Sequence, residues 1–255
     1  MYAEERQQAM AQLVAERGRL SVVELAETFD VTTETVRRDL SALERLGLAR
    51  RVHGGAVPAG SLAMIESGLL ERDQVLPDEK QRIARRALDL LPAAGSTVFI
   101  DAGSTTGHLI GLLPRDTRLV VFTHAVPIAA RLASHPHVEL HLLPGRVRVT
   151  TQAAVGADTV EALQRIRADV AFVGANGISA DHGASTPDRD EAATKRAMVR
   201  SAHRVVVLAD ATKVGQESAI SFADIGDVDV LVTDDQVRER DSAALTAAGV
   251  EVLVS

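Results

Sequence analysis

The apolar positions at the beginning of the chain recur with a helical period in two stretches. The first stretch predicts a helix over residues 3–17, with an apolar stripe at Met10, Leu13 and Val14. The second predicts a helix that begins after Thr32, with an apolar stripe at Val36, Leu40, Leu43 and Leu46. Each helix would bury its stripe against the other elements of a small N-terminal domain.

Polar residues mark where these helices begin and end. Ser21 and Glu24 have the spacing of a capping box, which predicts a short helix that runs from Ser21 to about Thr28. Thr32 is placed to cap the following helix, and Gly47 is placed to end it. Two short helices, a tight turn and a third helix are the components of a helix-turn-helix.

Two short extended runs follow within residues 48–57, on either side of Gly54-Gly55, and predict a hairpin, or wing. Side chains off the apolar stripe of the third helix would face the major groove of DNA. They are Thr33, Glu34, Thr35, Arg37, Arg38 and Ser41. Four wing residues would lie beside the DNA backbone, namely Arg50, Arg51, His53 and Gly54. The structural alternative is a solvated helix whose arginines pair with Asp39 and Glu44.

From residue 78 onward, short apolar runs alternate with helical stretches. Strands are predicted at 97–100, 119–122, 138–143, 170–173, 205–208, 228–232 and 250–253. Helices are predicted at 78–91, 106–113, 126–132, 159–166 and 190–202. This alternation predicts a doubly wound, mostly parallel α/β sheet with helices on both faces. We therefore expect a winged helix-turn-helix domain at 1–58, a linker at 59–77 and an α/β domain at 78–255.

Composition narrows the class of protein. Hydrophobic residues make up 46% of the 255 residues, which is enough for the cores of two domains. The absence of cysteine excludes disulfides, thiolate zinc sites and cysteine nucleophiles. No apolar run approaches the roughly 20 residues of a membrane span, and charged residues among the first 20 argue against a signal peptide. We expect a cytoplasmic protein with no cofactor and no bound metal.

The net charge of −7 is unusual for a DNA-binding protein, but the charge is unevenly distributed. Residues 1–58 hold eight Arg against nine Asp or Glu, a balance of −1. Residues 35–53 hold five Arg against two acidic residues, a balance of +3. DNA responds to the field of the contacting face rather than to the sum over the chain. The local charge is therefore compatible with DNA binding.

The first strand of the α/β domain leads into a loop of small residues, 101–107, and then directly into a helix. Free backbone N–H groups at the positive end of a helix dipole, together with hydroxyl donors, suit a phosphate. Walker A spacing is absent, which argues against a nucleoside triphosphate. Because the carboxyl ends of parallel strands meet at one edge, residues there form one candidate site. The predicted site residues are Asp101, Gly103, Ser104, Thr105, Thr106, Thr123, His124, Gly145, Arg146, Gly174, Asn176, Lys195, Asp210 and Lys213.

Each of these residues also has a purely structural interpretation. The loop at 101–107 would then be an ordinary strand-to-helix turn. Asn176 would brace a turn, and Lys213 would cover the sheet edge. Lys195 would form a solvated i,i+4 pair with Glu191 on its own helix.

The motif Thr35-Val36-Arg37-Arg38-Asp39-Leu40, followed by Arg51-Val52-His53-Gly54-Gly55-Ala56, resembles the signature of the DeoR-type family of bacterial sugar-metabolism repressors. The larger domain resembles the sensor of the same family. The matching segments are 101–106, 169–177, 185–187, 191–195 and 208–215. That sensor is related to ribose-5-phosphate isomerase and binds phosphorylated sugars without turnover. The resemblance implies a repressor of carbohydrate-utilisation genes that leaves its operator when a sugar phosphate binds.

Two segments depart from the usual family pattern. His124-Ala125 stands where Asn-Ser is common, and Pro144-Gly145-Arg146 stands where a Gly-Gly pair is common. The overall character most resembles regulators of fructose utilisation, which makes fructose 1-phosphate a candidate effector. We expect a homodimer or higher homo-oligomer on double-stranded operator DNA, because one small domain buries little surface on DNA.

Two other functions are open to these residues. One is a sugar-phosphate isomerase or deaminase that carries a DNA-binding head, with Asp101 or Asp210 as general base. The other is a binding module in which residues 1–58 contact a protein instead of DNA. Turnover of sugar phosphates would favour the enzyme, and a missing gel shift at low salt would favour the protein-binding module.

Overall fold

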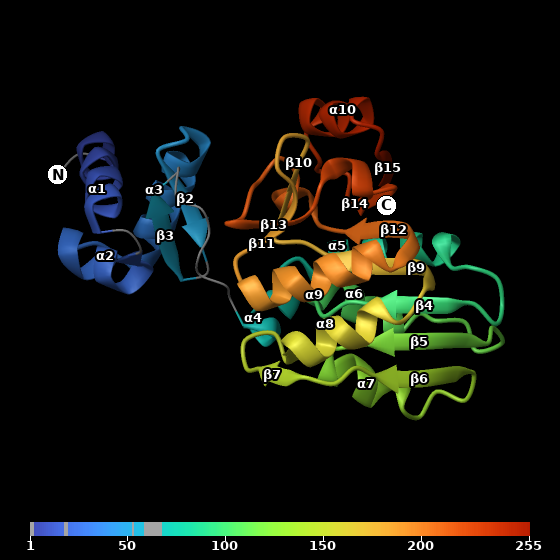
Figure 1. The fold of residues 1–255 in the computed structure, drawn as a ribbon. Coiled ribbons are helices and arrows are strands. Elements are labelled where there is room, and N and C mark those ends of the chain that lie inside the picture. Colours follow the sequence, from blue (N-terminus) through green and yellow to red (C-terminus); the bar gives the residue numbers. More distant parts are fainter. Residues whose placement is uncertain (1–2, 18–19, 53, 59–67) are drawn as a thin grey trace. The chain divides into compact units, whose positions relative to one another are not determined.

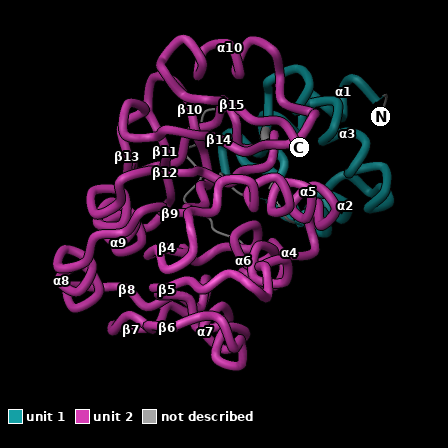
Figure 2. Tube along the Cα trace, turned by 90° about the vertical axis from the view of Figure 1, so that its right-hand side faces the viewer, with its two compact units in different colours: residues 1–62 teal, residues 63–255 magenta. Residues whose placement is uncertain are grey.

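The computed structural model describes residues 3–17, 20–52, 54–58 and 68–255. The chain forms two compact units, residues 1–62 and 63–255, which Figure 2 colours separately. No helix in the described part of the chain is long and apolar enough to cross a membrane.

The smaller unit contains three helices and a small antiparallel sheet (Figure 1). Its helices are α1 (Ala3–Arg17), α2 (Val22–Phe29) and α3 (Thr33–Arg45), and its strands are β1 (Leu20–Ser21), β2 (Ala49–Val52) and β3 (Gly55–Pro58). The capping box is confirmed, since Ser21 N–H lies 2.7 Å from Glu24 Oε2 and Glu24 N–H lies 3.1 Å from Ser21 Oγ. Thr32 caps α3 by accepting a hydrogen bond from Thr35 N–H at 3.2 Å.

The predicted apolar stripe of α3 is correct at Val36, Leu40 and Leu43, which are buried, but wrong at Leu46. Leu46 is 66% exposed. The helix ends at Arg45, so Leu46 already belongs to the turn in which Gly47 adopts a φ of +67°. The helical period therefore no longer determines which way the Leu46 side chain points.

The predicted wing is confirmed as the β2–β3 hairpin, in which Val52 pairs with Gly55 and Ala49 pairs with Pro58. The hairpin is part of a small sheet whose third strand, β1, has only two residues and was not predicted. Strand β1 pairs with β3. A Cβ atom on Gly55 would lie 2.1 Å from the Leu20 carbonyl oxygen. Glycine is therefore required where β1 and β3 meet.

The larger unit is built on a seven-stranded sheet in the order β15-β14-β12-β9-β4-β5-β6, in which every pairing is parallel. The strands are β4 (Thr97–Ile100), β5 (Leu119–Thr123), β6 (Val138–Leu142), β9 (Ala168–Gly174), β12 (Ala202–Leu208), β14 (Val230–Thr233) and β15 (Glu251–Val254). One face packs against α5 (Pro77–Ala87), α6 (Ser104–Ile110) and α7 (Val126–Leu132). The other packs against α8 (Ala157–Gln164), α9 (Arg189–Arg200) and α10 (Glu239–Ala247). The predicted doubly wound α/β fold is confirmed (Figure 1).

Several short elements were not predicted. They are a hairpin of β7 (Arg146–Arg148) and β8 (Ala153–Val155), a sheet of β10 (Gly177–Ser179), β11 (Gly183–Thr186) and β13 (Ile220–Ala223), and the 3₁₀ turns η2 (Ala211–Lys213) and η3 (Ile225–Asp227). The linker contains a short helix, α4 (Leu69–Asp73), and the predicted helix at 78–91 ends in the 3₁₀ turn η1 (Leu88–Leu90). Helix α10 was also missed. Segments of three to five residues span too little of a period to reveal themselves in the apolar pattern.

Several predicted helix boundaries are wrong: α6 and α8 differ from the prediction at both ends, and α5 ends four residues early. Helix α6 begins at Ser104, two residues earlier than expected, and ends at Ile110. The Thr106 hydroxyl donates to the Asp101 carbonyl oxygen at 2.8 Å, which ties the first turn of α6 to the end of β4. Helix α5 ends at Ala87 and continues only as the turn η1.

Candidate functional site

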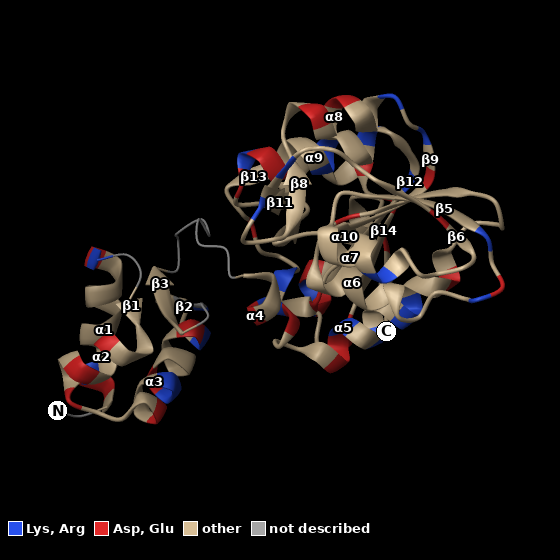
Figure 3. Ribbon diagram, turned by 90° about the horizontal axis from the view of Figure 1, so that it is seen from below, with Lys and Arg blue, Asp and Glu red and all other residues tan. Residues whose placement is uncertain are grey.

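The outer face of α3 presents two arginines. The side chains of Arg37 and Arg38 are 56% and 81% exposed, and each lies near Glu34, at 3.5 and 3.8 Å. Figure 3 shows basic and acidic positions side by side along α3. Ion pairs this long and this exposed contribute little to stability. The alternative pairing with Asp39 and Glu44 is not what holds these arginines, so both remain available to an anionic partner.

The wing is hydrogen-bonded to α3. Arg51 Nη1 donates to Ser41 Oγ at 2.9 Å, and Ser41 Oγ donates to the Arg37 carbonyl oxygen at 2.8 Å. The Arg51 N–H also donates to Glu44 Oε1 at 3.0 Å. These bonds fix the wing beside the helix that carries the exposed arginines.

The other predicted DNA-binding residues fall in three places. Thr33 and Thr35 are half-buried in the first turn of α3, where Thr35 Oγ1 lies 3.0 Å from Thr32 Oγ1. Arg50 lies on β2, and Gly54 forms the wing turn with a φ of +71°. His53 lies outside the described residues.

Asp39 is a structural residue that the sequence analysis did not identify. It is buried, and its carboxylate accepts hydrogen bonds from Arg6 Nε at 2.7 Å and Gln7 Nε2 at 2.8 Å. The hydrogen bond to Asp39 raises the pKa of Arg6. Its position three residues after Val36 and four before Leu43 places it on the buried stripe, which was the available signal. Asp39 therefore fastens α1 to α3 rather than contacting DNA.

The second candidate site lies at the carboxyl edge of the seven-stranded sheet. Except for Lys195, which lies on α9, the predicted residues follow five neighbouring strands, β12, β9, β4, β5 and β6. Four strand spacings correspond to roughly 19 Å, which is wider than one small ligand. The predicted set therefore divides into a centre at β9, β4 and β5 and two flanks.

A network of buried charges occupies the centre. Asp101 Oδ1 lies 2.9 Å from His124 Nε2, and Asp101 Oδ2 accepts hydrogen bonds from Lys195 Nζ and, at 2.8 Å, from Gly174 N–H. Lys195 Nζ also donates to the Gly174 carbonyl oxygen at 3.0 Å. On its other side, His124 Nδ1 lies 2.8 Å from the Ala154 carbonyl oxygen. Four of the predicted residues thus meet through side-chain or backbone groups.

The electrostatics of this network keep Asp101 ionised. Burial by itself would raise the pKa of the Asp101 carboxyl. The positive charge of Lys195 and the hydrogen bond from His124 outweigh burial and bring that pKa from 3.8 to about 2. The carboxylate is therefore a fixed negative centre that holds the Lys195 ammonium under the loop before α6.

The helical pair between Lys195 and Glu191 is not formed, because both side chains are buried and bind elsewhere. Glu191 is paired with Arg148 Nη1 at 2.6 Å and accepts a hydrogen bond from the Thr151 hydroxyl. One turn apart on α9, Glu191 and Lys195 therefore bind the β7–β8 segment and the end of β4, respectively.

The hydroxyl groups near the centre differ in their availability. Thr106 and Thr123 donate to backbone carbonyl oxygens at the end of β4, Thr123 at 2.7 Å to Ile100. Within the described part of the chain, the hydroxyls of Ser104 and Thr105 have no hydrogen-bond partner. The Cα atom of Gly103, just before them, would carry a Cβ only 3.0 Å from Thr106 Oγ1. Ser104 and Thr105 are thus the hydroxyl donors left for a ligand.

The flanking residues have local roles. Arg146 pairs with Asp190 at 2.7 Å on the surface, and Asn176 Oδ1 accepts from Thr186 Oγ1 at 3.1 Å. Gly145 has a φ of +140°, and a Cβ there would lie 2.2 Å from Thr159 Oγ1. Asp210 accepts from Thr212 N–H at 3.1 Å. The Lys213 ammonium makes no ion pair with the residues that the structure describes.

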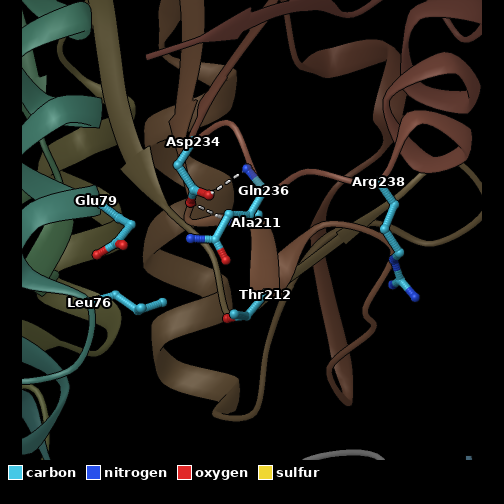
Figure 4. Close-up of a pocket in the computed structure, with 7 residues that line it drawn as sticks. All are labelled: Leu76, Glu79, Ala211, Thr212, Asp234, Gln236 and Arg238. Atoms are coloured by element: carbon cyan, nitrogen blue, oxygen red, sulfur yellow. Dashed lines mark hydrogen bonds between the residues drawn. The ribbon is translucent and has the colours of Figure 1, made fainter. Parts of the chain in front are cut away.

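A cavity of about 210 Å³ opens at the ends of β12 and β14, beside Ala211 and Asp234 (Figure 4). Its lining consists of Leu76, Glu79, Ala211, Thr212, Asp234, Gln236 and Arg238. The Asp234 carboxylate binds the N–H groups of Ala211 at 2.8 Å and Gln236 at 3.0 Å. The lining mixes apolar and polar side chains and carries two carboxylates, Glu79 and Asp234, against one cation, Arg238, so it favours a hydroxylated ligand over a second anion.

Lys80 is a further residue that the sequence analysis missed. It is buried, and its ammonium donates to the carbonyl oxygens of Arg72 and, at 2.5 Å, Val75, which ties α4 to α5. Burial lowers the pKa of Lys80, the negative charge of Asp210 opposes this, and the charge of Lys213 adds to it. Its position on the same helical face as Ile83, Ala84 and Ala87 was the signal in the sequence.

Both units match known protein families. Residues 6–61 match the DeoR-like helix-turn-helix domain, and residues 76–235 match the DeoR C terminal sensor domain. The transcriptional regulator GlpR of Haloferax volcanii is 34% identical over 253 residues, covering 99% of this chain and 98% of the relative. The glycerol-3-phosphate regulon repressor of Escherichia coli K12 is 31% identical over 231 residues, covering 90% of each chain.

Among solved structures, ribose 5-phosphate isomerase A of Methanocaldococcus jannaschii is 17% identical, covers 54% of each chain and has a TM-score of 0.40. The curated relatives are transcriptional regulators rather than enzymes. With a family match over each unit and relatives that span almost the full length, the chain belongs to the DeoR family of DNA-binding transcriptional regulators.

Proposed function

We propose that this regulator represses carbohydrate-utilisation genes and leaves its operator when a phosphorylated sugar binds the carboxyl edge of the seven-stranded sheet. One observation carries the proposal. The same chain has exposed arginines on α3 and, at the carboxyl edge of the seven-stranded sheet, a buried lysine and two unpartnered hydroxyls around a loop of small residues. Because the operator is chromosomal DNA, the same proposal places the protein in the cytoplasm.

On the DNA side, Arg37 and Arg38 would reach base edges or phosphates in the major groove, with Thr33, Glu34, Thr35 and Ser41 beside them. Arg50, Arg51, His53 and Gly54 would lie along the DNA backbone. The hydrogen bond between Arg51 Nη1 and Ser41 Oγ places the wing beside α3, which supports contact of both with the same DNA.

On the effector side, backbone N–H groups of Gly103 to Thr106 and the hydroxyls of Ser104 and Thr105 would hold the phosphate. The base of the phosphate site would consist of Asp101, Thr123, His124, Gly174 and Lys195. Asn176, Asp210 and Lys213 would face the remainder of the sugar, and Gly145 and Arg146 would close the far side. The ends of β4 and β12 are two strand spacings apart, about 10 Å, which suits a ligand with an anion at one end and hydroxyls at the other.

Fructose 1-phosphate is the effector we test first. The name of the Escherichia coli relative, a glycerol-3-phosphate regulon repressor, supports a small phosphorylated compound in the same class of regulator. The active species would be a homodimer or higher homo-oligomer on repeated half-sites, because a single α3 offers few base-reading side chains.

A gel shift with the DNA upstream of the protein's own gene, combined with a thermal-shift screen of phosphorylated sugars, tests the proposal. A ligand that binds only the folded state raises the melting temperature. We expect a specific shift, its reversal by one sugar phosphate, and no reversal by the unphosphorylated sugar. Turnover of the sugar phosphate, or failure to bind DNA at low salt, would contradict the proposal.

A further inference from the structure

Strand β6, Val138–Leu142, is the last strand of the seven-stranded sheet, and no strand among the described residues pairs with its outer edge (Figure 1). The bonds from Leu119 N–H to the His137 carbonyl oxygen, 3.1 Å, and from Leu143 N–H to the Thr123 carbonyl oxygen, 2.9 Å, place the odd-numbered residues of this segment toward β5. Backbone groups alternate in direction along a strand, so those of the even-numbered residues point away from the sheet.

The side chains along this edge are polar on one face and apolar on the other. Glu139 and His141 are 69% and 43% exposed and lie 2.9 Å apart on the same face. His141 also stacks on Phe122, with ring centroids 4.3 Å apart, which holds its ring in place. At the end of the strand, Leu142 is 54% exposed. An open edge with an exposed leucine is a template for pairing with another strand.

We propose that β6 pairs antiparallel with β6 of a second copy of this chain, about a twofold axis at Leu140. Leu140 N–H would bond to the partner's Leu140 carbonyl oxygen, and Leu142 N–H to the partner's Val138 carbonyl oxygen. Twofold symmetry repeats both bonds, which gives four. The two sheets would become one continuous sheet, and this inference names the interface of the dimer in the proposed function.

The side chains of Glu139 and His141 select the register, because a carboxylate accepts hydrogen bonds and an imidazole ring can donate one. Three antiparallel registers pair the outward-pointing backbone groups of the two copies. Their twofold axes lie at residue 139, 140 or 141. An axis at 139 places Glu139 against its own copy, and an axis at 141 does the same for His141. Only the axis at Leu140 places Glu139 opposite His141 of the second copy, twice per dimer. Directly opposite side chains on one face interact most strongly, and like pairs are unfavourable.

The other edge of the sheet does not have this property. On β15, Glu251 N–H donates to the Asp229 carbonyl oxygen and Ser255 N–H to the Thr233 carbonyl oxygen, both at 2.9 Å, so Val252 and Val254 point outward. Its one charged side chain, Glu251, is paired with Arg204 at 3.4 Å within the same chain. Pairing β15 with itself would bring no opposite charges together.

Because the chain has no cysteine, one introduced thiol reports on the register. In the full chain, Leu140→Cys would face its own copy with Cα atoms about 5.5 Å apart, within the range of about 4.4–6.8 Å that a disulfide bridges. Leu142→Cys is the matched control, because the two copies of residue 142 would lie about 13 Å apart along the strands. We expect rapid covalent dimers from Leu140→Cys and slow, collision-limited dimers from the more exposed Leu142→Cys. Equal rates would overturn the proposal.

A charge exchange tests the same register without oxidation. His141→Glu places glutamate opposite glutamate twice and should raise the dimer dissociation constant on the order of tenfold, measured by sedimentation. Adding Glu139→His restores opposite pairs only for the axis at Leu140, and should recover most of the affinity. A monomeric parent protein at micromolar concentration, or a double variant no better than the single one, would overturn the inference.

The outcome is separable from the proposed function. The thermal shift with sugar phosphates depends on the carboxyl edge and should persist in all these variants. An unchanged effector response with no effect of the β6 substitutions on the dimer rejects this interface alone. A missing effector response in the parent protein rejects the proposed function instead.

Discussion

The two candidate sites of this regulator treat charge in opposite ways. On α3, Arg37 and Arg38 stand in solvent with one distant acidic neighbour. At the carboxyl edge of the sheet, Asp101 and Lys195 are buried and bound to each other and to backbone groups. The arginines on α3 make only weak, exposed ion pairs. Asp101 and Lys195, in contrast, are held in place by hydrogen bonds to each other and to the backbone.

The difference follows from the partners. DNA is a long polyanion that attracts any exposed cationic face, and counterion release supplies much of the affinity. A small phosphorylated ligand offers few contacts, so its site must be arranged before the ligand arrives. We therefore expect that removing an arginine from α3 changes DNA binding. Removing a buried charge at the sheet edge should instead change the free energy of unfolding.

The largest effect should come from Lys195→Met. The substitution leaves the Asp101 carboxylate buried without its cation, which should cost about 3–5 kcal/mol of unfolding free energy. Urea unfolding followed by circular dichroism measures this loss. The double variant Asp101→Asn/Lys195→Met is the control, because removing both charges should recover part of the stability. If Lys195→Met were as stable as the parent, the network would not hold this edge together.

Acid should reveal the same network. The pKa of Asp101 is about 2 in the folded protein and 3.8 without its surroundings. A carboxyl with a lowered folded pKa stabilises the protein above pH 4 and loses that contribution as the pH falls toward 2. At about 1.4 kcal/mol per pKa unit, Asp101 should account for roughly 2 kcal/mol of the loss.

The comparison of urea unfolding at pH 5 and pH 3 captures about half of this loss, roughly 1 kcal/mol, because the folded pKa lies below pH 3. Other carboxylates titrate in the same interval, so Asp101→Asn provides the reference. Its unfolding free energy should fall less steeply between the two pH values than that of the parent. Identical slopes would mean that Asp101 has an ordinary pKa in the folded protein.

On the DNA side, Arg37→Ala and Arg38→Ala should each weaken operator binding by about 1–3 kcal/mol if the side chain reads a base edge. A phosphate contact would instead lower affinity for all sequences and reduce the salt slope by about one. Unfolding free energy should be unchanged, because both side chains are exposed. Arg85→Ala, an exposed arginine on α5, is the control for loss of charge. Unchanged operator affinity in both variants would exclude α3 as the DNA-reading helix.

The sequence predicted this contrast only in part. The caps at Ser21 and Thr32, the wing and the strands with β-branched runs were predictable because each has a local pattern that its own residues complete. The doubly wound sheet followed from the alternation of those runs with helices. Leu46 shows the limit of the method, since the period continued in the sequence after the helix had ended.

The buried partners could not be predicted. Whether Lys195 binds Glu191 on its own helix or Asp101 at the end of β4 depends on packing between elements 94 residues apart. The same holds for Asp39 with Arg6, and for Lys80 with the end of α4. In each case the charged residue shares a helical face with apolar residues, a signal in the sequence that was not read as burial, and only the fold supplied its partner.

The smallest effect should come from Lys213→Ala, which probes whether the edge also keeps a free charge. Lys213 is partly exposed and makes no ion pair with the described residues, so its removal should leave stability and operator affinity unchanged. If its ammonium faces the effector, calorimetry should show binding weakened about fivefold, or about 1 kcal/mol, as expected for a partly exposed charge contact. Release from the operator should then need correspondingly more sugar phosphate. Unchanged effector affinity would remove Lys213 from the site.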